Sequence, residues 1–574
     1  MKLLFETLKP YKWFIFLTLT IKSAATLVEL AIPYILSYIL DDVVPTKNVR
    51  NIVMWGVMMV ICSALALIGN VVANRMTARV TRKTSRRIRH RLFERTLTLS
   101  SAQIDRFTVP SLESRLTSDT YHVHGFLGMS MRMGVRAPLL LIGGVIVTAT
   151  LDPVLTLVML IVMPLISVSV WVITQRGIPL FKQSQRSLDS MIRIVREDSQ
   201  GIRVIKALSK TDYERRKYDG ANKRLVKDET RASMTMSASN PLVTFILNFG
   251  LVAVVLVGAF RVNSDLTQTG KIIAFIQYFT IISNAMIGIT RIFVHSSKGI
   301  ASMQRIAEVV NTEEDLRTES EEKYPPRADR KHIVFDDVSF SYIGKKDNLS
   351  HISFSLERGQ TLGIIGATGS GKTTLTQLLM RFYDVGEGAV YIDGRDVRTI
   401  PADELRSKFG VVMQNDFIYH GTVADNIDFG RDIPPERIKR AAELAQAAEF
   451  IELFPEKYEH TLTSKGTNIS GGQKQRILIS RALAANPEIL VLDDSSSALD
   501  YKTDAALRRS IRENLGETTT VVVAQRVSSI MNADLILVLD EGKIIGAGKH
   551  GELLESCDIY REISESQIGG AFVE

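Results

Sequence analysis

The residues with the clearest chemical potential form a glycine-rich loop, GATGSGKT, at positions 366–373. An apolar run, TLGII, precedes the loop and a helical pattern, TTLTQLLMRF, follows it. Glycines let backbone N–H groups wrap a phosphate, and the positive end of the following helix adds its dipole. In this spacing Lys372 would reach the terminal phosphates and Thr373 would ligate Mg²⁺. A glycine-rich turn without a ligand is the alternative, but the flanking strand and helix favour a phosphate site. The predicted nucleotide-binding residues of this segment are Gly366, Thr368, Gly369, Ser370, Gly371, Lys372, Thr373 and Thr374.

A second chemical feature is the stretch EILVLDDSSSALD, at positions 488–500. Its branched apolar residues predict a buried strand that ends in two carboxylates, Asp493 and Asp494. Asp493 would supply the Mg²⁺ carboxylate that a phosphate site needs, directly or through water. Many strands end in Asp, so this signal gains its weight from the loop at 366–373.

A third feature is NISGGQKQR, at positions 468–476, where a Ser-Gly-Gly turn opens a predicted helix. Backbone N–H groups at such a helix start can bind an anion. On its own, the same pattern also fits a plain helix N-cap.

These motifs lie in a C-terminal part of the chain where apolar runs alternate with helical patterns. Such alternation predicts an α/β domain with a mostly parallel sheet. We assign it to residues 331–574. The preceding residues 311–330 are acidic and end near a Pro-Pro pair, which predicts a linker.

Residues 1–310 differ, because apolar residues gather there in long runs while the whole chain of 574 residues is 45% hydrophobic. Each run can be part of a helix of the ~20 residues needed to cross a bilayer. The fold class predicted is therefore an α-helical transmembrane domain with six spans, followed by an α/β P-loop nucleotide-binding domain. The predicted spans are Trp13–Leu40, Ile52–Ala73, Pro138–Thr150, Val154–Ile173, Leu242–Phe260 and Ile272–Phe293.

Charge predicts the orientation of these spans. The net charge is +8, and basic residues concentrate at 75–95 and 176–227, whereas 41–51, 150–153 and 261–270 are short and nearly neutral. Cytoplasmic loops carry the excess of Lys and Arg, so both termini are expected in the cytoplasm of a cell (inner or plasma) membrane protein. The basic excess then reflects orientation and contact with the lipid bilayer, not nucleic acid. The two cysteines have neither disulfide nor zinc spacing.

Several polar residues fall inside the predicted spans. Intramembrane ionisable groups usually face a cavity or a partner, which makes Glu29 a candidate for the transport pathway. Lys22 and Glu29 lie seven residues apart on one helical face, so packing or snorkelling is an equal alternative. The polar residues are Lys22, Glu29, Asn240, Asn248, Gln277 and Asn284.

Taken together, the order of these motifs resembles the ATP-binding-cassette exporters, over essentially the whole chain. Six spans and one nucleotide domain are similar to a half-transporter of that family, with ATP and Mg²⁺ as ligands. The resemblance implies that Tyr342 stacks on adenine and that Gln414 contacts Mg²⁺ together with Thr373 and Asp493. It implies a signature motif at Ser470, Gly471, Gly472 and Gln473, which caps ATP bound to a second subunit, and a D-loop with Ser497 and Asp500 at the same interface. The stretches from Val109 and from Gln200 resemble those that carry the coupling helices.

The sequence departs from the family pattern at two positions beside the γ-phosphate. The family places Glu after the strand-ending Asp and His after the next strand, where this chain has Asp494 and Gln525. A general base must come within hydrogen-bond reach of its water, and an error of ~1 Å costs on the order of 100-fold. We therefore expect ATP binding with slow hydrolysis at this chain's own site. The intact signature motif would complete the competent site of a different partner subunit.

The expected function is thus one half of a heterodimeric exporter of amphipathic small molecules, of the bacterial multidrug type. Its ATP hydrolysis is expected mainly in complex with that partner. Export of lipids or peptides, or an ATP-gated regulatory membrane protein, remain alternatives. The sequence names neither the transported substrate nor the partner.

Overall fold

The computed structural model describes residues 2–329, 331–342, 347–495 and 498–568, apart from the side chains of residues 290, 291, 293 and 294. The chain divides into two compact units. The first comprises Met1–Leu97 and Pro110–Thr312, and the second comprises Thr98–Val109 and Glu313–Glu574. The second unit therefore includes a short segment, 98–109, from the N-terminal half of the chain.

The first unit is built from long helices. Six helical stretches among the described residues are long and apolar enough to cross a membrane, which confirms the six predicted spans. The longest helix has 49 residues and rises ~74 Å, more than twice the ~30 Å of a hydrocarbon core. The principal helices are α2 (Lys12–Tyr38), α3 (Val49–Leu97), α6 (Thr120–Met133), α7 (Arg136–Leu151), α8 (Pro153–Gln200), α10 (Thr211–Ser237), α11 (Ser239–Asn263) and α12 (Thr269–Val310).

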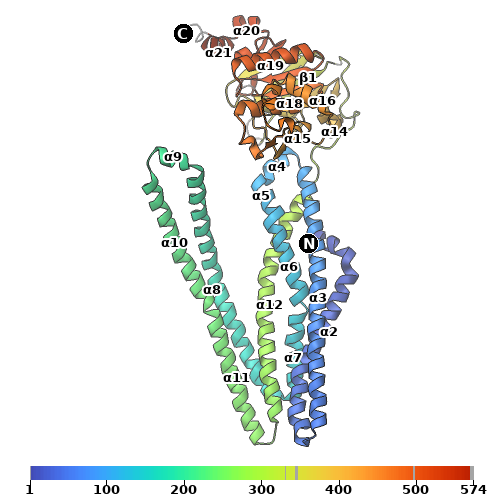
Figure 1. Cartoon of the computed structure of the whole chain (residues 1–574), viewed down its shortest axis with the longest axis vertical. Helices are drawn as coiled ribbons and strands as arrows, with labels where there is room; N and C mark the ends of the chain where they lie inside the picture. Colours follow the sequence, from blue (N-terminus) through green and yellow to red (C-terminus); the bar gives the residue numbers. More distant parts are fainter. Residues whose placement is uncertain (1, 330, 343–346, 496–497, 569–574) are drawn as a thin grey trace. The chain divides into compact units, whose positions relative to one another are not determined.

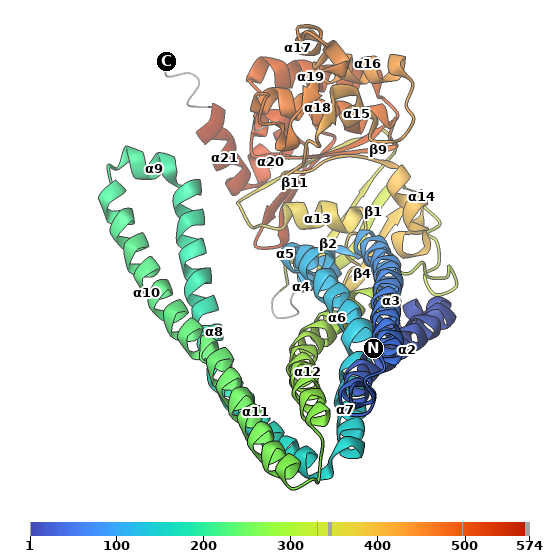
Figure 2. The same cartoon turned by 60° about the horizontal axis from the view of Figure 1, so that its bottom comes forward.

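Within this unit, α2, α3, α6, α7 and α12 pack against one another, while α8 runs beside α10 and α11 (Figure 1). The short helix α9 (Ile202–Ala207) closes the end of the α8–α10 pair, as Figure 2 also shows. The third span forms α7, which begins at Arg136 and is preceded by α6. The third candidate stretch as a whole is Val109–Leu151, so the short apolar run at Pro138–Thr150 is its C-terminal part.

The second unit contains two main sheets. In the described residues, one sheet has six strands in the order β12-β11-β3-β10-β9-β6, and the other has four in the order β2-β1-β4-β5. The strands β11, β3, β10, β9 and β6 are parallel neighbours. The bounds are β1 (Ile333–Phe340), β2 (Leu349–Leu356), β3 (Thr361–Gly366), β4 (Glu387–Ile392), β5 (Arg395–Asp396), β6 (Phe409–Val412), β9 (Ile489–Asp493), β10 (Thr519–Val523), β11 (Leu535–Asp540) and β12 (Lys543–Gly548).

The parallel sheet explains how distant motifs meet. All five residues of β9, ILVLD, are buried, as expected for a central strand covered on both faces. Because parallel strands end at one edge, the residues that follow β3, β6, β9 and β10 lie near one another. That edge carries the glycine-rich loop, Gln414, Asp493 and Gln525.

Candidate functional site

A cleft of about 680 Å³ lies at this edge of the sheet. It brings together the glycine-rich loop with Gln414, Asp493, Asp494 and Gln525, which are far apart in sequence. The predicted residues Tyr342, Ser370, Ser470–Gln473 and Asp500 do not line it. The lining residues are Asn348, Ile365, Gly366, Ala367, Thr368, Gly369, Gly371, Lys372, Thr373, Thr374, Gln414, Asp493, Asp494, Val523, Ala524, Gln525, Leu539, Asp540, Ile559 and Ile563.

The glycine-rich loop joins β3 to helix α13 (Lys372–Leu379). Gly371 caps this helix with φ 99°, and a Cβ there would come 2.9 Å from the carbonyl oxygen of Asn348. A glycine is therefore required by both conformation and space. Lys372 Nζ donates hydrogen bonds to the carbonyl oxygens of Gly366 (3.0 Å) and Ala367 (2.7 Å), so the loop curls around the ammonium group.

The side chain of Asp493 is a buried acid beside this loop. It is 3% exposed, and its Oδ2 has no hydrogen-bond partner among the described residues. Burial raises the pKa of Asp493, and a hydrogen bond with the Thr373 side chain opposes this rise. A buried carboxylate oxygen without a donor is costly. A divalent cation held by oxygen ligands would satisfy it, so Asp493 and Thr373 fit a Mg²⁺ site.

Asp494 and Gln525 are in direct contact. Gln525 Nε2 donates a hydrogen bond of 2.8 Å to Asp494 Oδ2. Asp494 has φ 51°, a conformation that Asp tolerates better than most residues, and its N–H donates to the carbonyl oxygen of Val523 (3.0 Å). Burial raises the pKa of Asp494, while hydrogen bonds from Gln525 and Gln414 and the charge of Lys372 lower it. Two side-chain amides thus hold the carboxylate.

Lys372 completes this electrostatic group. Burial lowers the pKa of Lys372, and the charges of Asp493 and Asp494 raise it. One ammonium thus faces two carboxylates within a partly enclosed cleft. The group is arranged to bind a ligand that carries both anionic oxygens and a cation, as a metal–phosphate does.

Tyr342 lies beside the cleft. Its hydroxyl is hydrogen-bonded to Thr374 Oγ1 (3.2 Å) and Gln377 Oε1 (2.7 Å), and its ring packs edge-on against Phe340 and Tyr383 at 4.9 and 5.1 Å between centroids. The side chain is held in place, yet the residue is 41% exposed. A positioned, accessible ring is compatible with base stacking.

The signature segment forms the start of helix α18 (Gly471–Ala484). Ser470 Oγ accepts a hydrogen bond from the N–H of Gln473, and Gln473 Oε1 accepts one from the N–H of Ser470. This capping box accounts for both side chains within the helix itself. Asp500 similarly caps helix α19 (Tyr501–Asn514) through the N–H of Thr503 (2.9 Å). Ser497 lies outside the described residues.

The segment of the N-terminal half that belongs to the second unit ends where the expected coupling stretch begins. We placed a coupling segment from Val109 onwards, but the segment within the second unit is 98–109, with helix α4 (Ser101–Phe107). Asp105 Oδ2 accepts a hydrogen bond of 2.7 Å from the Tyr383 hydroxyl. Nothing in the local sequence pattern pairs these two residues. Asn348, Ile559 and Ile563 were missed for the same reason.

The polar residues of the first spans have partners within the first unit. Lys22 Nζ donates to Asn70 Oδ1 (2.7 Å) and Asn74 Oδ1 (3.2 Å). Glu29 Oε1 lies 2.6 Å from Arg136 Nη2, which also accounts for the arginine at the start of α7. These contacts favour helix packing as the role of Lys22 and Glu29.

Comparison with known proteins agrees with this geometry. The ABC transporter transmembrane region family matches residues 15–286, and the ABC transporter family matches residues 349–497. The chain is 34% identical to the uncharacterized ABC transporter ATP-binding protein YfiB of Bacillus subtilis, over 98% of both chains. It is 32% identical to an uncharacterized ABC transporter ATP-binding protein of Mycobacterium bovis, over 100% of this chain and 99% of that one. A bacterial Atm1-family ABC exporter, solved with ATP bound, has the same fold, with a TM-score of 0.80 at 22% identity and 99% coverage of both chains.

The fold and the cleft define an ATP-hydrolysing membrane transporter subunit. The chain belongs to the ABC transporter family, as a half-transporter of the exporter type with one membrane domain and one nucleotide domain. The predicted fold class and ATP-hydrolysing activity are thereby confirmed.

Proposed function

We propose that this chain is the slow-site subunit of a heterodimeric exporter of amphipathic compounds in the cell membrane, with both termini in the cytoplasm. It would bind ATP in the cleft, with Lys372 at the phosphates and Thr373, Gln414 and Asp493 around Mg²⁺. Ser470–Gln473 would complete the hydrolytic site of a second half-transporter. We also propose that residues 1–310 form the transmembrane domain, residues 311–330 the linker and residues 331–574 the nucleotide-binding domain.

The observation that carries the proposal is the hydrogen bond from Gln525 to Asp494. A general base needs a free carboxylate oxygen within reach of the attacking water. Asp494 is one methylene shorter than Glu, and Gln525 and Gln414 donate to its carboxylate. The raised pKa of Asp494 favours its action as a base. Catalysis is therefore limited by the short reach of the side chain and by the hydrogen bonds that its carboxylate already accepts. Gln525 also remains neutral, whereas His can carry charge.

Bound Mg²⁺ would neutralise charge on the transferring phosphate. The chain's own residues do the remaining work: backbone N–H groups of the loop bind the phosphates, Lys372 balances their charge, and Tyr342 offers a ring to the base. At these positions the chain keeps the residue types of the family pattern. ATP binding is therefore expected to be retained while hydrolysis is slow.

The test uses the full chain purified alone in lipid nanodiscs, with bound ATP and released phosphate measured separately. Saturable ATP binding with little phosphate release supports the proposal. Turnover near the ~10 s⁻¹ typical of enzymes would contradict it. Co-expression with a second half-transporter that carries Glu and His at the two positions should restore turnover.

Three alternatives remain within membrane transport: export of lipids, export of peptides, or ATP-gated regulation. Vesicles loaded with ATP and containing the complex separate a pump from a regulator. Uphill, ATP-dependent movement of an amphipathic dye supports a drug exporter. Downhill ion flux opened by ATP, without pumping, would favour a regulator.

A further inference from the structure

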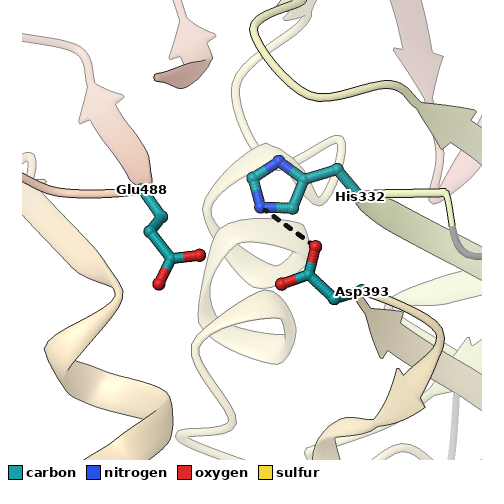
Figure 3. Close-up of side chains that lie close together, drawn as sticks. All are labelled: His332, Asp393 and Glu488. Atoms are coloured by element: carbon teal, nitrogen blue, oxygen red, sulfur yellow. Dashed lines mark ion pairs between the residues drawn. The ribbon is translucent and has the colours of Figure 1, made fainter. Parts of the chain in front are cut away.

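Three side chains outside the ATP cleft point into a common space in the second unit (Figure 3). His332 directly precedes β1, Asp393 follows β4, and Glu488 directly precedes β9. One ligand atom of each lies within 4.8 Å of the others. The group sits where β9 begins, whereas the ATP cleft is where β9 ends.

His332 has one satisfied ring nitrogen and one that is not. It is 2% exposed, and its Nδ1 lies 2.6 Å from Thr519 Oγ1. Its Nε2 is buried without a hydrogen-bond partner in the part of the chain that the structure describes. Nε2 lies 3.9 Å from Asp393 Oδ1, too far for a hydrogen bond. The buried Nε2 therefore lies near the carboxylates without a hydrogen bond to any described residue.

Hydrogen bonds with backbone groups fix the orientation of the His332 ring. Thr519 Oγ1 accepts a hydrogen bond from the N–H of Gly359 (3.0 Å), and the N–H of Thr519 donates to the carbonyl oxygen of Glu488 (3.0 Å). The N–H of Asp393 donates to the carbonyl oxygen of His332 (2.9 Å). Metal-binding imidazoles are held in the same way, with the second ring nitrogen bonded to a fixed oxygen.

A cation already bridges the two acids. Arg358 Nη2 lies 2.9 Å from Asp393 Oδ1 and 3.3 Å from Glu488 Oε2. The Arg358 side chain is 49% exposed, so it can turn into solvent. Lys408 Nζ lies 3.0 Å from Glu488 Oε1 and 3.6 Å from Asp393 Oδ2. Arg358 neutralises the carboxylates but leaves the imidazole nitrogen without a bond.

We propose that His332, Asp393 and Glu488 form a binding site for a divalent transition-metal ion of the zinc type, which takes the place of the Arg358 guanidinium. The ion would bind carboxylate oxygens of Asp393 and Glu488 and would also satisfy His332 Nε2. One imidazole and two carboxylates suit Zn²⁺ and similar ions better than Mg²⁺ or Ca²⁺, which prefer oxygen ligands alone. Lys408 stays with the outer oxygens of the carboxylates.

The site would tie together the starts of β1 and β9 and the end of β4, and thereby the two main sheets. Arg358 competes with the ion, because both use the same carboxylate pair. This competition predicts a distinctive result: removal of Arg358 should strengthen metal binding, although it removes two ion pairs from the protein.

The test uses the full chain in nanodiscs, purified through a tag without histidine, stripped with EDTA and free of nucleotide. Co²⁺ serves as a spectroscopic probe, and Zn²⁺ is titrated by calorimetry and by the shift of the thermal midpoint. Wild-type protein should bind one ion with a visible Co²⁺ absorption band. His332→Gln should weaken binding by at least ~10-fold, the scale found even for side chains one shell further from a metal.

Two variants serve as controls. Arg358→Gln should bind Co²⁺ more tightly than wild type, and His351→Gln, at an exposed histidine paired with Asp337, should bind it equally well. Glu488→Gln repeats the loss if His332→Gln does not fold. The proposal is overturned if wild type and Arg358→Gln show no saturable binding, or if His332→Gln and Glu488→Gln both bind as wild type does. It does not depend on transport or ATP hydrolysis.

Discussion

At the scale of single residues, Asp493 shows how a ligand site can weaken the fold that carries it. Its carboxylate is buried, and one oxygen receives no hydrogen bond from the described residues. Burial raises its folded-state pKa above the unfolded value. The ionised form thus destabilises the fold at neutral pH, and this cost is removed as the pH falls through the raised pKa.

The first prediction concerns this residue. Without nucleotide and Mg²⁺, Asp493→Asn should unfold at a higher temperature than wild type at neutral pH, because the buried charge is gone. The difference between the two should shrink as the pH is lowered, since wild-type Asp493 then gains a proton. Thermal unfolding at several pH values, monitored by intrinsic fluorescence, measures both effects. A wild-type protein that is more stable at neutral pH would contradict this account of Asp493.

At the scale of elements, helix α4 is joined to the aromatic cluster next to the ATP cleft. Tyr383 packs against Tyr342 and donates to Asp105 of α4. Burial raises the pKa of Tyr383 and the Asp105 charge adds to this, so the phenol remains a donor. Tyr383 therefore connects the ring that would stack on adenine to the segment 98–109.

The second prediction tests this connection. Tyr383→Phe removes one hydrogen bond to a charged acceptor, worth about 1 kcal/mol at a partly exposed position. Amide hydrogen exchange in residues 101–107 should become faster by several-fold. Tyr342→Phe is the matched control, because it removes the hydrogen bonds to Thr374 and Gln377 but leaves the bond between Tyr383 and Asp105 in place. Equal exchange rates in wild type and Tyr383→Phe would contradict the proposed connection between helix α4 and the aromatic cluster.

Local sequence allowed some of these elements to be predicted, and tertiary contacts decided the rest. The loop at 366–373 and the strand ending at Asp493 are contiguous patterns, so their types and order could be read directly. The bond between Gln525 and Asp494 joins two different strand ends, and only the parallel sheet brings them together. Tyr383 with Asp105, and His332 with Glu488, are similarly remote in sequence and carry no local pattern.

At the scale of the whole molecule, the orientation in the membrane is the property that charge predicts most directly. The third prediction uses single cysteines in two exposed turns, Ser209→Cys and Ser264→Cys. Native Cys62 and Cys557 are buried, so their background labelling should be low. In intact cells an impermeant maleimide should label position 264 and should label position 209 only after lysis. The reverse pattern would contradict the predicted cytoplasmic termini.

The central claim is that Asp494 and Gln525 make this chain's own ATP site slow. The most direct measurement is phosphate release by the purified chain carrying Asp494→Glu and Gln525→His together, compared with wild type at equal ATP occupancy. Because a placement error of ~1 Å costs on the order of 100-fold, turnover should rise by at least ~10-fold while ATP affinity stays the same. Wild-type turnover already equal to that of the double variant would contradict the account.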